Sequence, residues 1–355
     1  SYLETVMVDR PMPRLAALAT ASPEHVLRQS DVAEAGRRLF GSERDGIERL
    51  LPIYNNAGIE RRQSCMPLEW YLEEHSFSER NRLYREHAVA LLAQAADRCL
   101  EEAGLQHDEI DTIVTVSTSG IATPGLDAHL MTIRPFRQDV QRLPIFGLGC
   151  VGGVLGLARA GALAKAEPAS HVLFLCVELC GLTFRRDDHS KSNFVATALF
   201  GDGAAAALIT TEGKGPALAR WGEHTWADSL DVMGWDVADD GFGVVFSRNI
   251  PNLVRAQMRQ AASRFAKSAG FSLHELDNMI CHPGGAKVLD ALEDAFGLEP
   301  GTMVHARETL RLHGNMSAAT ILFVLERALK HEPPGRWLLS SLGPGFTAGF
   351  LLLEG

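Results

Sequence analysis

The sequence predicts an α/β protein whose sheets are mostly buried. The chain has 355 residues, of which 46% are hydrophobic and 22% are charged, as in ordinary globular proteins. Short apolar runs typical of buried strands alternate along it with longer segments of helical periodicity. This alternation favours sheets covered by helices, and the composition excludes disordered, collagen-like and coiled-coil chains.

The first half of the chain shows this alternation most clearly. The segment 78–104 carries an apolar stripe at helical spacing and ends at Gly104, a typical stop signal. In chain order we expect a helix capped by Ser30-Asp31 and running to Phe40, a helix over 78–104, a strand over 111–117, a loop over 118–125, a short helix, a strand over 143–149, a helix over 151–166, a strand over 171–179 and a glycine turn that enters a strand within 196–210.

The second half repeats the theme. We expect a helix over 252–269, a strand over 276–281, a loop and helix over 282–296, a strand-like connection at 302–306, a helix over 315–330 and two strands joined by a glycine turn over 336–354.

A repeated sequence pattern suggests that the chain consists of two similar halves. The pattern G-x-G-x-x-A occurs at 201–206 and again at 343–348, each time before an apolar strand. Each copy lies downstream of a turn that starts a long apolar helix, at Cys150 in the first half and at Asn315 in the second. The expected halves are residues 1–215 and 216–355.

Charge and cysteine usage exclude several classes of protein. The net charge of −10 makes general binding of nucleic acid or anionic membrane unfavourable, so an anionic ligand requires a local basic patch. The six cysteines form no C-x-x-C pair, so we expect neither a disulfide framework nor a metal site, and reduced thiols suggest the cytoplasm. Residues 1–14 carry charges and no apolar stretch, and no apolar run reaches the ~18 residues of a membrane span, so we expect no signal peptide and no transmembrane segment.

Cys150 is the strongest candidate for chemistry. It lies in GLGCVGG (147–153), between an expected strand and the start of an expected helix. A thiol at a helix N-terminus experiences the positive end of the helix dipole, which favours the nucleophilic thiolate. The flanking glycines permit a sharp turn and close approach of a substrate. The alternative is a small buried core residue, which free cysteine often is.

The same letters allow a second interpretation. G-x-G-x-x-G between a strand and a helix is the dinucleotide-binding fingerprint, which requires an acidic residue about 20 residues further on. Glu178 is the only strand-end candidate, 26 residues beyond Gly152, and Cys150 inside the motif would crowd a pyrophosphate.

His282 and Asn315 complete a possible catalytic set with Cys150. His282 follows a short apolar strand in CHPGG (281–285), and Asn315 precedes a helix in HGNMS (313–317). A histidine can hold a thiolate as an ion pair, and an amide can donate to a developing oxyanion. Taken singly, His282 could cap a turn and Asn315 could be an ordinary helix cap.

The sequence resembles the chalcone-synthase-like, or type III, polyketide synthases of the thiolase-like superfamily. The resemblance covers nearly the whole chain, and the order and spacing of Cys150, His282 and Asn315 agree with the family. The motifs that carry it are GLGCVGG (147–153), VELCGLTF (177–184), ALFGDGAAA (198–206), CHPGGAKVLDALE (281–293), HGNMSAA (313–319) and LGPGFTAGF (342–350).

The resemblance implies a homodimer of five-layered αβαβα subunits that uses acyl-CoA and malonyl-CoA and needs no other cofactor. Cys150 would carry the growing chain as a thioester, kept ionised by His282, while His282 and Asn315 would bind malonyl-CoA and stabilise the enolate. Phe200 matches the family's gatekeeper phenylalanine. The further cavity residues would be Thr118, Ser119, Thr123, Cys180, Thr183 and Ser317. Arg61 and Arg62 are the candidates for binding the CoA phosphates, with a solvated surface pair as the alternative.

The short motifs of this sequence look most like those of bacterial synthases that extend long fatty acyl-CoA into alkylpyrones or alkylresorcinols. Cys180 and Thr123 replace a threonine and a methionine of plant members, which makes the expected cavity lining smaller or less polar. The alternatives are a malonyl-only pentaketide synthase with a naphthalene-type product, a single-step condensing enzyme of fatty-acid synthesis, a nicotinamide-binding oxidoreductase and a non-catalytic dimeric scaffold.

Overall fold

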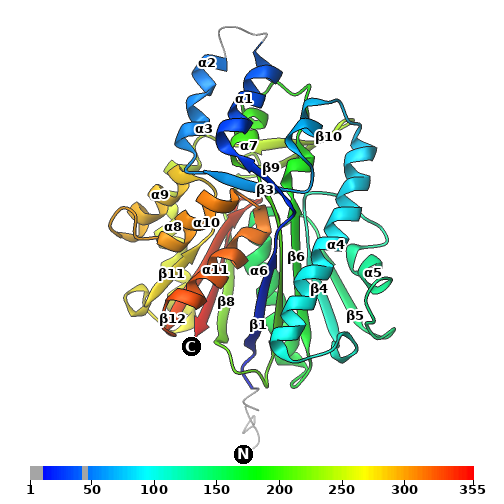
Figure 1. Cartoon of the computed structure of the whole chain (residues 1–355). Coiled ribbons are helices and arrows are strands. Elements are labelled where there is room, and N and C mark those ends of the chain that lie inside the picture. The colour runs from blue at the N-terminus through cyan, green and yellow to red at the C-terminus, as the bar shows by residue number, and fades with distance from the viewer. Residues whose placement is uncertain (1–10, 42–46) are drawn as a thin grey trace, which may run out of the picture.

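The computed structural model describes residues 11–41 and 47–355 (Figure 1). The expectation that residues 1–10 contain no signal peptide therefore falls outside the described residues. The strands are β1 (Arg14–Ala21), β2 (His25–Arg28), β3 (Arg61–Ser64), β4 (Thr112–Val116), β5 (Gln141–Ile145), β6 (Val172–Leu179), β7 (Asp202–Thr210), β8 (Ala217–Thr225), β9 (Met233–Ala238), β10 (Gly241–Phe246), β11 (Asn278–Cys281), β12 (Arg336–Gly343) and β13 (Thr347–Glu354).

Helices connect and cover these strands. In the described part of the chain, no helix has the length and apolar character needed to cross a membrane. The α-helices are α1 (Gln29–Phe40), α2 (Ile47–Leu50), α3 (Pro52–Asn56), α4 (Phe77–Ala103), α5 (Leu126–Met131), α6 (Gly152–Ala166), α7 (Lys191–Leu199), α8 (Ile250–Ala269), α9 (Ala286–Phe296), α10 (Val304–His313) and α11 (Thr320–His331). The 3₁₀ turns are η1 (Leu68–Leu72), η2 (His107–Glu109), η3 (Gly149–Val151), η4 (Cys180–Thr183), η5 (Leu273–Glu275) and η6 (Ser317–Ala319).

Most expected elements are present, and α4 shows why its signals were reliable. The Ser76 hydroxyl accepts a hydrogen bond from the Glu79 amide at its start, and Gly104 takes the left-handed conformation at its end. Several expectations were wrong in detail: the strand expected over 143–149 is β5, which ends at Ile145, and the helix expected over 315–330 begins at Thr320. Two further errors have an identifiable cause. The strand-like connection at 302–306 is instead the entry to α10, where the Glu293 carboxylate accepts a hydrogen bond from the Met303 amide at 2.9 Å.

The second error concerns the start of α1. The helix begins at Gln29, so Ser30 and Asp31 lie inside its first turn and the N-cap position is Arg28. The Gln29 side chain is buried and donates to the carbonyl oxygens of Tyr54 and Ala198. The helix thus starts one to two residues earlier than the Ser-Asp pair predicts, and its first residue is held by contacts with distant parts of the chain.

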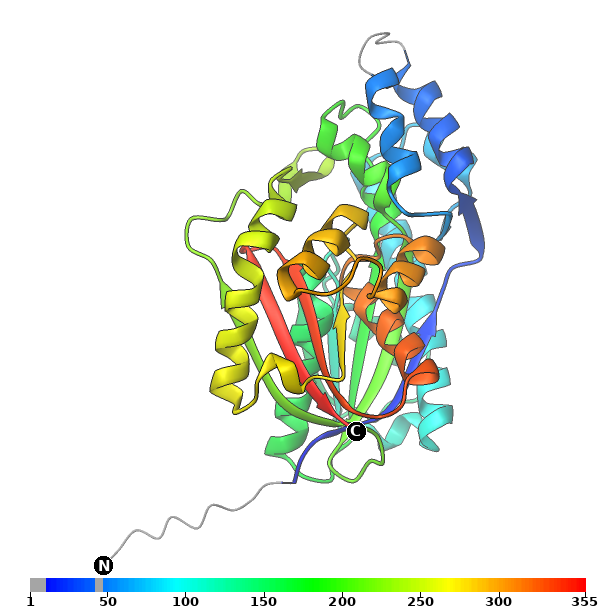
Figure 2. The same cartoon turned by 90° about the vertical axis from the view of Figure 1, so that its left-hand side faces the viewer.

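Nine of the described strands form one sheet in the order β11-β12-β13-β8-β1-β7-β6-β4-β5, while β2 pairs with β3 and β9 with β10. The large sheet divides into a first sub-sheet, β1-β7-β6-β4-β5, and a second, β11-β12-β13-β8. A single residue pair, Arg14 with Ala217, joins β1 to β8. Helices α4 and α5 cover the outer face of β1, β7, β6 and β4, whereas α8 covers β8 and β13 and packs against α9 (Figures 1 and 2). Helices α6 and α11 contact each other and both sub-sheets, which gives the five layers αβαβα.

The two middle helices approach each other closely at the ends where the candidate residues lie. A side chain at Gly153 would collide with the carbonyl oxygen of Ala318, so this contact requires glycine. Cys150 precedes α6 and Asn315 precedes α11, and the close contact therefore brings turns from the two halves of the chain together. The boundary between residues 215 and 216 stays a prediction.

Candidate active site

Cys150 lies in η3, directly before α6, and is 7% exposed. Gly149 adopts φ +54°, and a Cβ there would lie 2.6 Å from the Pro344 ring, so the turn before the thiol requires glycine. The Cys150 thiol donates to the Ser317 hydroxyl across 3.6 Å. Burial is the main reason why the pKa of Cys150 is raised to about 12; the hydrogen bond to Ser317 lowers the pKa, and Glu178 contributes to raising it. Burial thus opposes the thiolate that the helix N-terminus favours.

His282 immediately follows β11 and is 5% exposed. Its amide donates to the carbonyl oxygen of Ser340 at 2.9 Å, which fixes its backbone beside β12. Both ring nitrogens are buried without a hydrogen-bond partner among the described residues. Burial lowers the pKa of His282 to about 4, which favours the neutral imidazole. Burial therefore opposes a charge on Cys150 and on His282 taken separately, and the ion pair expected between them stays a prediction.

Hydrogen bonds join Asn315 to Ser317, which contacts Cys150, and to the loop that follows His282. Its side-chain oxygen accepts from the Ser317 amide at 2.8 Å, and its side-chain nitrogen donates to the Gly284 carbonyl at 3.3 Å. Ser317 contacts the Cys150 thiol, and Gly284 lies in the loop that follows His282. A continuous set of contacts therefore joins Cys150, Ser317, Asn315 and the loop of His282.

Phe200 lies beside Asn315, as a gatekeeper next to the reaction centre would. The two residues form an isolated parallel bridge, with the Asn315 amide donating to the Leu199 carbonyl at 2.7 Å. The Phe200 ring packs against Trp235 and Phe246, with ring centroids 6.4 and 5.8 Å away. The sequence interpretation missed Trp235, whose indole nitrogen donates to the Thr118 carbonyl at 2.9 Å.

Glu178 is a second residue that the sequence interpretation missed as part of this site. It is fully buried at the end of β6, and one carboxylate oxygen accepts from the Thr118 amide at 2.6 Å while the other has no partner among the described residues. Burial raises its pKa to about 8. Thr118 and Ser119 are also buried here, where they accept hydrogen bonds from the amides of Gly149 and Leu179. A charged residue inside the apolar run VLFLCVEL was the available signal.

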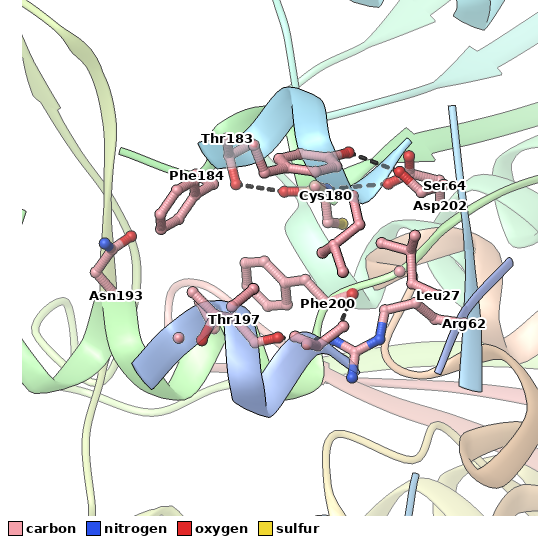
Figure 3. A pocket seen from close by; sticks show the side chains of 18 of the residues that line it. Leu27, Arg62, Ser64, Cys180, Thr183, Phe184, Asn193, Thr197, Phe200 and Asp202 are labelled. Carbon is pink, nitrogen blue, oxygen red and sulfur yellow. Dashed lines mark hydrogen bonds between the residues drawn. The ribbon is translucent and has the colours of Figure 1, made fainter. Parts of the chain in front are cut away.

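Cys180, Thr183 and Phe200 line a pocket beside the reaction centre (Figure 3). Water-sized groups can enter about 80 Å³ of it, and the 690 Å³ of empty space around this includes open solvent. The Cys180 thiol lies near enough to Cys150 to influence its charge, which connects the pocket to the nucleophile. The apolar part of the wall comes from the N-terminal helices and their neighbours, namely Leu27, Val32, Ala35, Leu39, Phe40, Leu68, Phe184 and Ala196.

The hydroxyl and amide groups of this pocket wall are already bonded within the protein. Thr183 donates to the Cys180 carbonyl at 2.6 Å, and the Asn193 amide donates to the Arg185 carbonyl at 2.8 Å. Two further hydroxyl pairs are Ser64 with Tyr71 at 2.7 Å and Thr197 with Tyr54 at 2.6 Å. The wall therefore suits an apolar ligand better than a polar one.

The two arginines suggested for CoA binding have different environments. Arg61 is exposed on β3, whereas Arg62 is 3% exposed and burial lowers its pKa to about 10. The Arg62 guanidinium donates to Gln29 and to the carbonyl oxygens of Thr197, Ala198 and Phe200. Arg62 is thus occupied by internal bonds around the end of α7, and its predicted role in phosphate binding is not supported.

Two other expectations concern residues away from this pocket. Thr123 precedes a cis proline and is exposed on the single chain, so a place for it in a substrate cavity would require a second subunit. The dinucleotide interpretation of 147–153 lacks an open cradle, because Gly149 packs against the Pro344 ring. The segment instead holds Cys150 against Ser317.

Comparisons with known proteins agree with this arrangement. A model of the N-terminal domain of chalcone and stilbene synthases matches residues 7–213, and one of the C-terminal domain matches residues 226–355. The chain therefore belongs to the chalcone and stilbene synthase family. It is a type III polyketide synthase, an acyltransferase-type enzyme of decarboxylative condensation. The resemblance seen in the sequence is confirmed.

Individual relatives span nearly the whole chain. A putative chalcone synthase of Bacillus subtilis (strain 168) is 38% identical over 360 residues, covering 97% of this chain and 99% of its own length. A 1,3,6,8-tetrahydroxynaphthalene synthase of Streptomyces peucetius subsp. caesius is 38% identical, covering 96% and 92%. The crystal structure of the 1,3,6,8-tetrahydroxynaphthalene synthase of Streptomyces coelicolor A3(2) superposes with a TM-score of 0.92 at 29% identity, covering 96% of this chain and 99% of that one.

Proposed function

We propose that Cys150 takes an acyl group from acyl-CoA as a thioester and that the chain then extends it with units from malonyl-CoA. In the loading step, the Cys150 sulfur forms a bond to the thioester carbonyl carbon and its proton passes to a ring nitrogen of His282. The bond between that carbon and the CoA sulfur breaks, and CoA leaves with a proton. The observation that carries this proposal is the convergence of Cys150, Asn315 and the His282 loop around Ser317.

The extension step requires donors where negative charge develops. Loss of carbon dioxide from malonyl-CoA leaves an enolate whose oxygen needs hydrogen bonds. The Asn315 amide has two N–H groups, of which one donates to Gly284, so one remains for the enolate. The His282 ring has no internal partner to give up. The enolate carbon then attacks the Cys150 thioester, and no cofactor besides the CoA thioesters is required.

A long-chain acyl starter is the first candidate substrate. The apolar pocket next to Cys180 and Phe200 suits an alkyl chain, because burial of each CH₂ contributes about 0.8 kcal/mol. With two or three extensions, lactone closure would give an alkylpyrone and aldol closure an alkylresorcinol. The second candidate uses malonyl-CoA alone and forms a naphthalene-type pentaketide. The relatives named 1,3,6,8-tetrahydroxynaphthalene synthase favour this alternative.

We expect that filling the pocket separates these candidates. Ala196 is buried on the pocket wall, whereas Val195, the preceding residue of α7, is not part of it. Ala196→Phe should lower kcat/KM for dodecanoyl-CoA at least about tenfold relative to hexanoyl-CoA, because the longer chain loses its space. Mass analysis of products from malonyl-CoA with a ladder of acyl-CoAs provides the measurement, and Val195→Phe is the matched control.

The outcomes are distinct. A parent enzyme that ignores every acyl-CoA and converts malonyl-CoA alone to an aromatic pentaketide would reject the long-chain starter. Equal losses for both chain lengths in Ala196→Phe, with Val195→Phe unaffected, would show that the pocket does not hold the tail.

We also propose a homodimer. Ile121, Leu143 and Phe146 are apolar and 46%, 39% and 58% exposed on or beside the edge strand β5, close to the exposed Thr123. An exposed apolar group of this kind is typical of a protein interface. Phe146→Asp should convert a dimer to a monomer in analytical ultracentrifugation, whereas Leu230→Asp, at another exposed apolar residue, should not. A parent protein that sediments as a monomer would refute the dimer.

A further inference from the structure

Ser341 lies on the face of β12 that points toward the nucleophile. Side chains alternate along a strand, so Ser341 and Gly343 share one face and Ser340 lies on the other. A Cβ at Gly343 would lie 2.7 Å from the Val151 amide nitrogen, which belongs to the turn that carries Cys150. Gly349 is the register partner of Ser341 on β13, and a Cβ there would lie 2.7 Å from the Val151 side chain. The positions of Gly343 and Gly349 therefore both indicate that the Ser341 side chain points toward η3.

The register of the neighbouring strand places His282 beside Ser341 on the same face. Strands β11 and β12 run parallel, with Cys281 opposite Ser340, and the side chains of that pair lie 3.3 Å apart. Continuing this register by one residue beyond the end of β11 would place His282 opposite Ser341, and residues opposite each other on neighbouring strands share a face. The His282 amide bond to the Ser340 carbonyl continues the ladder to this position.

Both side chains lack partners. Ser341 is 2% exposed, and its hydroxyl has no hydrogen bond, while both ring nitrogens of His282 are equally unpaired among the described residues. A buried hydroxyl without a partner is costly, and a serine hydroxyl can rotate to serve as donor or acceptor. The other neighbour of Ser341 in the sheet is Gly349, which offers no side chain.

We propose that Ser341 is a positioning residue whose hydroxyl accepts a hydrogen bond from one ring N–H of His282 and thereby directs the other ring nitrogen toward Cys150. The inference rests on the proposed role of Cys150 and His282. When the Cys150 S–H bond breaks and the proton moves to the free ring nitrogen, the bond to Ser341 persists and stabilises the imidazolium. Ser341 therefore favours formation of the thiolate without touching the substrate.

Few other titratable groups face this pair. Glu178 at the end of β6 and Cys180 in η4 influence the Cys150 thiol, and β12, β13 and η6 present no charged side chain to it among the described residues. Burial opposes the charge on Cys150 and on His282, so a hydrogen bond that favours the imidazolium would also favour the thiolate. A change at Ser341 should accordingly appear in the pH dependence of Cys150 reactivity.

The test is the pH profile of Cys150 alkylation by iodoacetamide, followed by mass spectrometry of the Cys150 peptide. Ser341→Ala should slow alkylation at neutral pH about tenfold and move the midpoint up by about one pH unit, while Ser341→Thr, which retains the hydroxyl, should restore the parent profile. The matched control is Ser340→Ala, an adjacent buried serine that faces away and pairs with Cys281. It should leave the profile unchanged.

The results separate this inference from the proposed function. A parent-like profile in a folded Ser341→Ala protein, or an equal shift in Ser340→Ala, would overturn the role of Ser341 alone. Failure of the proposed function would instead appear in Cys150→Ala, as acyl extension that continues without the thiol. Circular dichroism of each variant distinguishes lost positioning from lost structure.

Discussion

Replacement of Cys150 by alanine is expected to lower acyl extension by about 10⁴-fold or more, since the variant lacks the thiol that we propose holds the growing chain as a thioester. The measurement is product formation from malonyl-CoA and an acyl-CoA starter, together with the mass of the protein after incubation with starter alone. The parent should gain the mass of one acyl group, and the variant should gain none.

Cys99→Ala provides the control for this prediction. Cys99 is also fully buried, but it lies on α4, in the hydrophobic core on the outer side of the first sub-sheet. Its removal deletes a buried thiol without touching the site, so extension should continue near the parent rate. Acyl extension by Cys150→Ala at the parent rate would discard the mechanism. Acylation of a different cysteine, such as Cys180, would reassign the nucleophile.

Burial opposes a charge on Cys150 and on His282 when each is considered separately. Transfer of a proton from the thiol to the imidazole would produce both charges together, where they stabilise each other. The two buried groups can exchange a proton internally at no cost in net charge. Reaction with an alkylating reagent should therefore depend on His282 as well as on Cys150.

The sequence predicted the elements whose signals are local. The ends of α4 carry their own caps, and the glycines around Cys150 mark a turn before a long apolar helix. The strands β1 and β8 were missed because what stabilises them is pairing with distant strands, β1 with β7 and β8 with β13. Such pairing depends on the whole sheet and leaves a weak mark on either strand alone.

The candidate site also contains residues that the sequence could suggest and residues that it could not. Cys150, His282 and Asn315 could be proposed from the sequence because a thiol, an imidazole and an amide lie in glycine-rich turns before or after regular elements. Their burial could not be predicted, since burial is a property of the folded chain. Ser341 and Glu178 look like ordinary residues of apolar strands, and only the register and the missing partners distinguish them.

Arg62 shows how a local interpretation of charge can fail. An arginine pair in a polar segment suggests a surface, yet alternation along β3 turns one side chain outward and the other inward. The groups that receive the inward guanidinium belong to α7 and Phe200, 135 to 138 residues away in the sequence. No feature of the sequence near Arg62 predicts these acceptor groups.

Arg62→Met is therefore expected to destabilise the protein by several kcal/mol. The change leaves the carbonyl oxygens of Thr197, Ala198 and Phe200 buried without their donor, and each unpaired group costs about 1–3 kcal/mol. A total stability of about 5–15 kcal/mol is typical, so the loss should be visible as a much lower denaturant midpoint. Arg62→Lys should rescue only part of it, because an ammonium cannot reproduce the planar set of donors.

Arg61→Met is the matched control and should change stability by less than about 0.5 kcal/mol, because Arg61 is exposed. If Arg61 binds the CoA phosphates, this variant should raise KM for malonyl-CoA while kcat changes little, and the effect should weaken at high salt. The two neighbours would then have separate functions, one in stability and one in substrate capture. An Arg62→Met protein that unfolds at the parent midpoint, with a raised KM, would reverse this assignment and return Arg62 to the CoA site.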